Sequence, residues 1–270
     1  MNHFLRSMAM AMVGMAMAMP ASAQNCSDAA ACNYNPDFGN ASICLTIDTV
    51  VTHTAGDLAG MTTYRIYVQS ATPQDFVTAV YGNQAEPLAL TTTTSFYQNV
   101  LGGVTAQSIN PLLLPSFPDL EFDSYVTIGL SQMADVAAGE NAPSTAASPN
   151  QNWTQAFEAG GNLVIDDIVG GLWFIYNGDA NGLPDEQGRI LLAQLTTDGD
   201  IGGTLNIQYF PGGGDADSES FDLDALCVVD EEDCIYAAPN EDCDGACLND
   251  VDADGICDEV DDCIGVVDEC

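Results

Sequence analysis

The sequence predicts an all-β fold, a β-sandwich or a jelly roll, for the long middle part of the chain, residues 45–226. Three observations predict it. Short runs rich in Val, Ile, Thr, Tyr and Phe recur along this part, and Gly, Pro, Asn or Asp bounds each run. The part is long enough to bury one sizeable core. One run, TTYRIYVQS, also alternates, so that Tyr64, Ile66 and Val68 are expected to face the core together.

The runs give the expected elements in chain order. We expect strands over residues 47–53, 62–70, 76–81, 124–130, 162–166, 173–176, 189–196 and 204–210. Two stretches interrupt this pattern, because residues 104–114 and 131–138 favour short helices. Residues 139–151, rich in Ala, Ser, Pro and Asn, are expected to form a long surface loop.

The first 23 residues have the composition of a cleaved signal peptide. Arg6 precedes a Met- and Ala-rich apolar run over residues 7–19, and small residues end the segment at Ala23. The apolar run is shorter than a bilayer crossing requires, so we expect no membrane span. The mature chain is therefore predicted to begin near Gln24 and to be secreted or held at the outer cell surface.

The charge of the chain is strongly one-sided. Forty Asp and Glu residues face three Lys and Arg residues, and the formal net charge is −37. Beyond the signal segment only Arg65 and Arg189 remain as bases. Such a surface repels nucleic acid and anionic lipid, whose binding depends on clustered Lys and Arg, and it attracts divalent cations.

All ten cysteines lie outside the middle part and divide the chain into three. They are Cys26, Cys32 and Cys44 before it, and Cys227, Cys234, Cys243, Cys247, Cys257, Cys263 and Cys270 after it. In an exported chain this predicts two small disulfide-stapled segments, residues 24–44 and 227–270. Both groups are odd in number, which leaves two possibilities. Either Cys44 pairs with Cys227 across the modules, or Cys270 lacks its partner because the chain stops inside a repeat.

The acidic stretch NDVDADGICDEVDDC contains the pattern of a calcium loop. Carboxylates alternate at the start, Gly255 follows, and further carboxylates stand at the ninth and twelfth positions. A hard cation takes six to eight oxygens, and a glycine after the fifth position permits the bend that turns them inward. The expected ligands are Asp250, Asp252, Asp254, Asp258 and Asp261. The alternative interpretation is a merely solvated acidic tail.

This stretch resembles the thrombospondin type 3 family of calcium repeats, DxDxDGxxDxxDxC, at each motif position. Residues 24–44, QNCSDAAACNYNPDFGNASIC, resemble an ACNYNP-type cysteine module of exported surface proteins of marine Bacteroidetes. The terminal DDCIGVVDEC resembles the start of longer repeats in such proteins, which implies a truncated C-terminal repeat. The resemblance implies a calcium-binding surface protein and assigns no activity to the middle part.

Candidates for catalysis are few. His53 is the sole histidine after the signal segment, and at the end of a strand it is expected to be an exposed surface residue. The chain contains carboxylates of the kind that glycoside hydrolases use in pairs. Asp119, Glu121 and Asp123 alternate on an expected strand. Asp166 and Asp167 end another strand. In a chain of this charge, exposed acids without a catalytic role are the expected interpretation of both sets.

Three further features allow two interpretations each. Residues 177–182, NGDANG, with Asp185 and Glu186 beyond them, have the oxygens for a calcium site but also the composition of a hairpin loop. Trp153 and Trp173 favour a place in the core, the alternative being a sugar-stacking platform with Phe157 and Tyr176. Arg189 is expected to form a buried ion pair with a structural role.

These observations predict a secreted or cell-surface, calcium-binding structural or adhesion protein that is not an enzyme. Its expected partners are calcium ions, with a polysaccharide or another surface protein as a further partner. Calcium is the expected cofactor. The alternatives are a carbohydrate-binding module and, less favoured, a secreted hydrolase.

Overall fold

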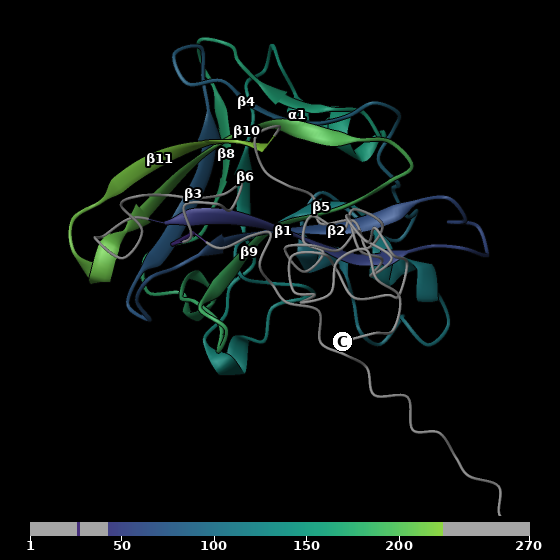
Figure 1. Ribbon diagram of the computed structural model, residues 1–270, viewed down its shortest axis with the longest axis horizontal. Helices are drawn as coiled ribbons and strands as arrows, with labels where there is room; N and C mark the ends of the chain where they lie inside the picture. Colours follow the sequence, from purple (N-terminus) through teal and green to yellow (C-terminus); the bar gives the residue numbers. More distant parts are fainter. Residues whose placement is uncertain (1–25, 28–42, 224–270) are drawn as a thin grey trace, which may run out of the picture.

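A computed structural model of the chain describes residues 26–27 and 43–223 (Figure 1). The prediction of an all-β sandwich is confirmed. Two antiparallel sheets enclose a common core, and short 3-10 helices and one short α-helix lie in the connections. The β-branched runs form these strands because a pleated sheet buried on one face suits their stiff side chains.

The first sheet has four strands. Their order is β1 (Cys44–Thr52), β2 (Thr62–Gln69), β9 (Arg189–Thr197) and β5 (Tyr125–Val126). The register places Ile66 of β2 between Ile47 of β1 and Ala193 of β9. All three side chains point into the core, as the alternation along residues 62–70 predicts.

The second sheet has seven strands. They are β3 (Phe76–Gly82), β4 (Leu88–Thr92), β6 (Ser144–Ala146), β7 (Leu163–Ile165), β8 (Gly171–Phe174), β10 (Ile201–Phe210) and β11 (Asp217–Asp222). The order is β6, β8, β3, β10, β4, β7, with β11 on the opposite side of β10. All pairs of strands are antiparallel.

The register shows that β3 and β4 lie end to end along the same edge of β10. Residues 210 to 206 of β10 pair with β3, and residues 204 to 201 pair with β4. β7 and β8 repeat this arrangement on the far side of β4 and β3. Asn206 lies at the break, where its buried amide donates to the carbonyls of Tyr81, Glu86 and Pro87 at 2.9–3.1 Å. The excursion of the chain at residues 83–87 is therefore stabilised from inside the sheet.

Apolar side chains cover both faces of the four-stranded sheet. The main cluster lies between the sheets and includes Ile66, Trp173 and Ile207. A second cluster, which includes Tyr67 and Tyr125, lies on the outer face under residues 106–130. The alternation along residues 62–70 predicted a single core face, so the second apolar cover is a correction. It arises because the irregular segment after β4 folds back onto this sheet.

Several predicted elements are shorter than expected. In place of the two expected helices the structure has only the 3-10 turns Ala106–Ser108 and Val136–Ala138. Of the expected strand 124–130 only β5 is formed. The expected loop 139–151 contains β6, and the short helix α1 (Trp153–Glu158) follows it. Asn152 caps α1, its side chain accepting from the N–H of Gln155.

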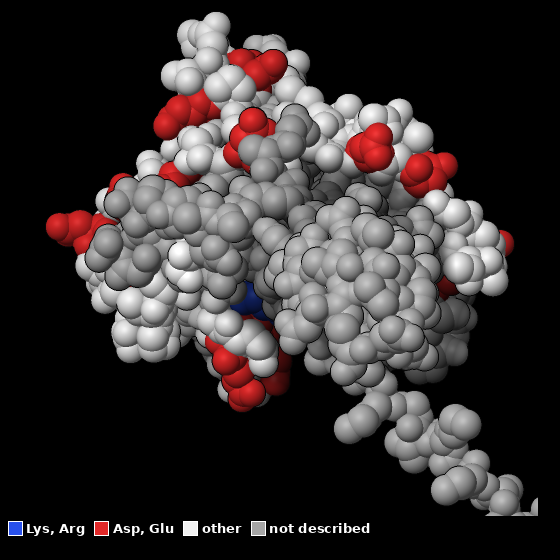
Figure 2. Space-filling model, in the orientation of Figure 1, with Lys and Arg blue, Asp and Glu red and all other residues white. Residues whose placement is uncertain are grey.

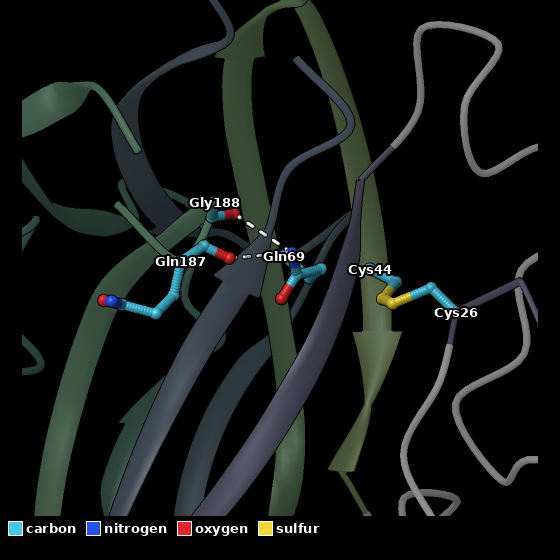
Figure 3. The surroundings of a disulfide bond; sticks show 5 residues. All are labelled: Cys26, Cys44, Gln69, Gln187 and Gly188. Carbon is cyan, nitrogen blue, oxygen red and sulfur yellow. Dashed lines mark hydrogen bonds between the residues drawn. A yellow bond between two sulfur atoms is a disulfide. The ribbon is translucent and has the colours of Figure 1, made fainter. Parts of the chain in front are cut away.

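A disulfide joins Cys26 to Cys44, the first residue of β1, with the two Cα atoms 6.1 Å apart (Figure 3). Gln69 pairs with Cys44 in the register and donates to the carbonyls of Gln187 and Gly188 at 3.4 and 3.3 Å. Because Cys44 is paired with Cys26, the possible bridge from Cys44 to Cys227 is wrong. The other cysteines lie outside the described residues.

Candidate functional site

The predicted calcium ligands Asp250, Asp252, Asp254, Asp258 and Asp261 all lie outside the described residues, as does the predicted signal peptide. Within residues 26–27 and 43–223, no group of three or more His, Cys, Asp or Glu side chains is arranged to hold a metal ion. The calcium loop therefore remains a prediction from the sequence.

The loop 177–182 uses its oxygens on its own neighbours. The two carboxylate oxygens of Asp179 accept from the N–H of Tyr176 at 2.9 Å and from the side chain of Asn141 at 2.7 Å. The buried amide of Asn181 donates to the carbonyls of Ile128 and Asn141, and its oxygen accepts from the N–H of Asn141. This arrangement favours the hairpin-loop interpretation, because the donors of the chain occupy the oxygens that a cation would need.

The acids at 119, 121 and 123 do not alternate on a strand, so that prediction is wrong. Pro118 starts a 3-10 helix, Pro118–Phe122, and Asp123 follows it. The Asp123 carboxylate is fully buried and accepts from the N–H groups of Asn99 at 2.7 Å and Gly103 at 3.2 Å. A side chain at Gly102 would collide with it. Asp123 thus fastens the loop 99–103 and has no space beside it for a substrate.

Burial raises the pKa of Asp123 to about 6, although its N–H donors oppose that shift. A folded-state pKa above the unfolded value of about 3.9 means that the folded protein binds the extra proton between these two pH values. We therefore expect the contribution of Asp123 to stability to fall by about 2–3 kcal/mol as the pH rises from about 4 to about 6. Above that range its contribution should be constant.

Urea unfolding of the wild type and of Asp123→Asn at several pH values measures this contribution, because the difference cancels the other carboxylates. The stability of the wild type relative to the variant should decrease between pH 4 and 6. The matched control is Asp57→Asn, because Asp57 is an exposed acid. Glu158→Gln would not serve as a control, because Glu158 accepts a hydrogen bond from the N–H of Val104. A pH-independent difference for Asp123→Asn would contradict the assignment.

Asp166 and Asp167 belong to a turn. Asp166 accepts from the amide of Gln151 at 2.7 Å, and Asp167 accepts from the N–H of Gly170 at the same distance. Gln151 in turn accepts from the N–H groups of both aspartates. These contacts position the second excursion of the seven-stranded sheet, residues 166–170, rather than a pair of catalytic carboxylates.

His53 is half-buried, so the expectation of an exposed histidine is wrong. Its Nε2 lies 2.9 Å from the hydroxyl of Thr63, and its ring meets Phe122 edge-on with the centroids 4.5 Å apart. The hydroxyl of Thr63 lies 2.8 Å from that of Thr196, and both threonines are fully buried. Desolvation lowers the pKa of His53, which Asp119 partly offsets. Although a histidine and a hydroxyl are adjacent, a substrate cannot reach the hydroxyl.

Both tryptophans lie in the core, as the sequence favoured, with Trp153 1% and Trp173 0% exposed. Their rings are 5.8 Å apart between centroids. Each indole donates to a carbonyl, Trp153 to Ala146 at 2.9 Å and Trp173 to Thr127 at 3.0 Å. The alternative of a sugar-stacking platform built on these two tryptophans is therefore wrong.

The two arginines lie on the outer face of the four-stranded sheet. Arg189 forms the predicted ion pair, with Asp48 at 2.6 Å, and its guanidinium lies 4.2 Å from the centre of the Tyr67 ring. The pair is half-exposed, not buried as expected. Arg65 donates to the amide oxygen of Gln194 at 2.9 Å. In Figure 2 acidic atoms are spread over the visible surface, whereas basic atoms are confined to one small recessed area.

The outer face of the seven-stranded sheet carries an aromatic pair, the half-buried Phe174 and the exposed Tyr176. Sequence reasoning named Tyr176 only as part of a platform with the tryptophans and missed Phe174. Phe174 and Tyr176 point away from the core and meet edge-on, with their centroids 5.7 Å apart. In the register Phe174 lies beside Ala79 of β3, and Ala79 lies beside Gln208 of β10. We call this surface, made of Tyr81, Phe174, Tyr176, Ala79, Gln208 and Ser218, the aromatic face. The inward positions of Trp173 and Ile175 were the signal that could have found it.

Comparison with protein-family models, with curated proteins and with solved structures found no match to the chain. Among the residues that the structure describes, no helix has both the length and the apolar character to cross a bilayer. The geometry thus defines a sandwich of two hydrogen-bonded sheets with a partly aromatic outer surface on the larger sheet.

Proposed function

We propose that this chain is a secreted or cell-surface, calcium-binding structural or adhesion protein. The observation that carries the proposal is the register of carboxylates from Asp250 to Asp261 around Gly255. Random acidic runs do not keep such a register, whereas a calcium loop requires it. In this proposal the β-sandwich is the rigid unit to which the calcium-binding segment is attached, and the protein is not an enzyme.

Calcium would act by neutralising carboxylates that otherwise repel one another. Asp250, Asp252 and Asp254 stand at alternate positions, and Asp258 and Asp261 complete the set. Without the ion their mutual repulsion opens the loop, so ion binding and local folding become one event. Affinities of about 10⁻⁴ to 10⁻³ M are typical of extracellular calcium modules.

The sandwich supports the structural part of this proposal. Its buried carboxylates are used on its own chain, with Asp75 accepting from Ser70, Thr72 and Gly212, and Asp123 from two backbone N–H groups. His53 is hydrogen-bonded to a hydroxyl that substrate cannot reach. These contacts favour a structural module over a hydrolase.

Calcium titration by calorimetry tests the proposal. The probe is CaCl₂ added to the oxidised chain from Gln24 onward, in the wild type and in an Asp252→Ala, Asp254→Ala double variant. We expect saturable binding in the wild type and its loss in the variant. An Asp57→Ala, Asp135→Ala double variant is the matched control, because it removes two exposed acids of the sandwich and should bind as the wild type does. The absence of binding up to about 10 mM calcium would refute the proposal.

A further inference from the structure

The aromatic face has a shape set by its strand register. Ala79 is buried and small, and it forms a floor between Phe174 on one side and Gln208 on the other. Tyr176 continues the aromatic side beyond Phe174 and is 69% exposed. Ser218 of β11 extends the row past Gln208. The result is a row of side chains across the sheet that is aromatic at one end and polar at the other.

The polar side of this row is partly held in place. The side-chain oxygen of Gln208 accepts from the hydroxyl of Thr78 at 3.2 Å, and Gln208 is exposed. Tyr81, two residues along β3 from Ala79, donates its hydroxyl hydrogen to Glu86 at 3.2 Å. Polar groups fixed in this way bind a ligand at a lower cost in conformational entropy than free side chains do.

The aromatic face is also neutral within a very acidic protein. The six residues that define it carry no charge. Acids adjoin three of these residues: Asp179 accepts from the N–H of Tyr176 at 2.9 Å, Asp217 accepts from the N–H of Ser218 at 2.8 Å, and Glu86 accepts from the hydroxyl of Tyr81 at 3.2 Å. A basic protein would be attracted to the acidic surface elsewhere, and an acidic polymer would be repelled by the net charge of −37. The exposed apolar area is too small for a protein–protein core, because Phe174 is itself half-buried.

We propose that the aromatic face binds a neutral polysaccharide. The apolar faces of pyranose rings stack on exposed aromatic rings such as Tyr176, and sugar hydroxyls pair with amide and hydroxyl groups such as those of Gln208 and Ser218. An open sheet face can contact a polymer chain along its length, whereas a closed pocket would accept only a chain end. This inference rests on the proposed function in one respect: a protein exported to the cell surface is in contact with extracellular polysaccharides.

Binding is measured with cellulose, chitin, xylan and mannan as neutral probes and alginate as the acidic probe, by pull-down for insoluble polymers and affinity electrophoresis for soluble ones. The wild type is expected to bind at least one neutral probe and not alginate. Tyr176→Ala should weaken that binding by about fivefold or more, since aromatic contacts of this kind are worth about 1 kcal/mol or more. Gln208→Ala should weaken it by about threefold to tenfold.

Phe117→Ala is the matched control, because Phe117 is an exposed aromatic residue at the helix Pro118–Phe122, away from the aromatic face. It should bind as the wild type does. Circular dichroism and urea unfolding of each variant confirm that its fold is kept, and all three substituted side chains are exposed. No binding to any neutral probe, or equal losses in Phe117→Ala and Tyr176→Ala, would overturn the proposal.

The same measurement separates this inference from the calcium proposal. The aromatic face lies in the sandwich, so binding to the neutral probe should persist in EDTA and in the Asp252→Ala, Asp254→Ala variant. Loss of calcium binding with retained polysaccharide binding would refute the calcium proposal alone. Retained calcium binding without polysaccharide binding would refute the aromatic-face proposal alone.

Discussion

Trp173→Ala is expected to destabilise the protein by about 3–5 kcal/mol, the range for removing a large aromatic side chain from a core. Trp173 is fully buried and packs against Trp153 at the centre of the main cluster. Its indole on β8 also donates to the carbonyl of Thr127, just beyond β5, so it joins the two sheets. The substitution leaves both a cavity and a buried carbonyl without its donor.

Urea unfolding followed by circular dichroism measures this loss without depending on tryptophan fluorescence. The control is Tyr176→Ala, three residues along the chain, which removes an exposed aromatic ring and should change stability by less than about 0.5 kcal/mol. A loss below about 1 kcal/mol for Trp173→Ala would show that this side chain is not in the core.

Asp75→Ala is expected to cost about 2–4 kcal/mol, because hydrogen bonds to a charged group are the stronger ones and several are lost together. The carboxylate of Asp75 is buried and connects the end of β2 to the turn after β10. It accepts from the hydroxyls of Ser70 at 2.7 Å and Thr72 at 2.9 Å, and from the N–H of Gly212 at 2.7 Å. Without it, these donors lose their shared acceptor.

The pH dependence of this contribution is opposite in sign to that of Asp123. Desolvation alone would raise the pKa of Asp75, but the donors from Gly212, Ser70 and Thr72 outweigh it, so the pKa lies below its ordinary value. The stabilisation is then fully present above the unfolded pKa of about 3.9 and is lost as the pH falls through the folded pKa.

The difference in unfolding free energy between the wild type and Asp75→Ala should therefore shrink below about pH 4. Asp135→Ala is the matched control, since Asp135 is exposed and its side chain accepts from the N–H of Ala137 in its own turn. Its substitution should cost no more than about 1 kcal/mol. A difference for Asp75→Ala that grows as the pH falls would contradict the assignment.

Local composition was sufficient to predict the strands with long β-branched runs, but not those that depend on pairing. β2 and β9 were predicted nearly to their ends, because Val, Ile, Leu and Thr dominate them. β11 has the sequence DSESFD, whose alternating acids gave no strand signal, and it is a strand because β10 supplies its hydrogen bonds. β6 likewise depends on β8, although its surroundings have the composition of a loop.

The aromatic face likewise has one part that local sequence can predict and another that depends on strand pairing. Alternation around Trp173 and Ile175 contained the signal that places Phe174 and Tyr176 on the outer face of a sheet, although the prediction from sequence did not use it. Phe174 lies beside Ala79, and Ala79 beside Gln208, because strands that are far apart in the chain pair with one another. This register could not be predicted from the single sequence. The acids near 119 were misplaced because Pro118 starts a tight helix where alternation suggested a strand.

β9 and β10 follow each other in the chain, yet they are inner strands of different sheets. β9 pairs with β2, where Arg65 and Gln194 are 129 residues apart, and β10 pairs with β3, where Thr78 and Gln208 are 130 apart. Such long-range pairing gives a high contact order, for which folding times of milliseconds to seconds are usual. In a chain that emerges from its N-terminus, β2 and β3 each keep an open edge until residues 189–210 are available. That interval is when this protein is most exposed to edge-to-edge aggregation.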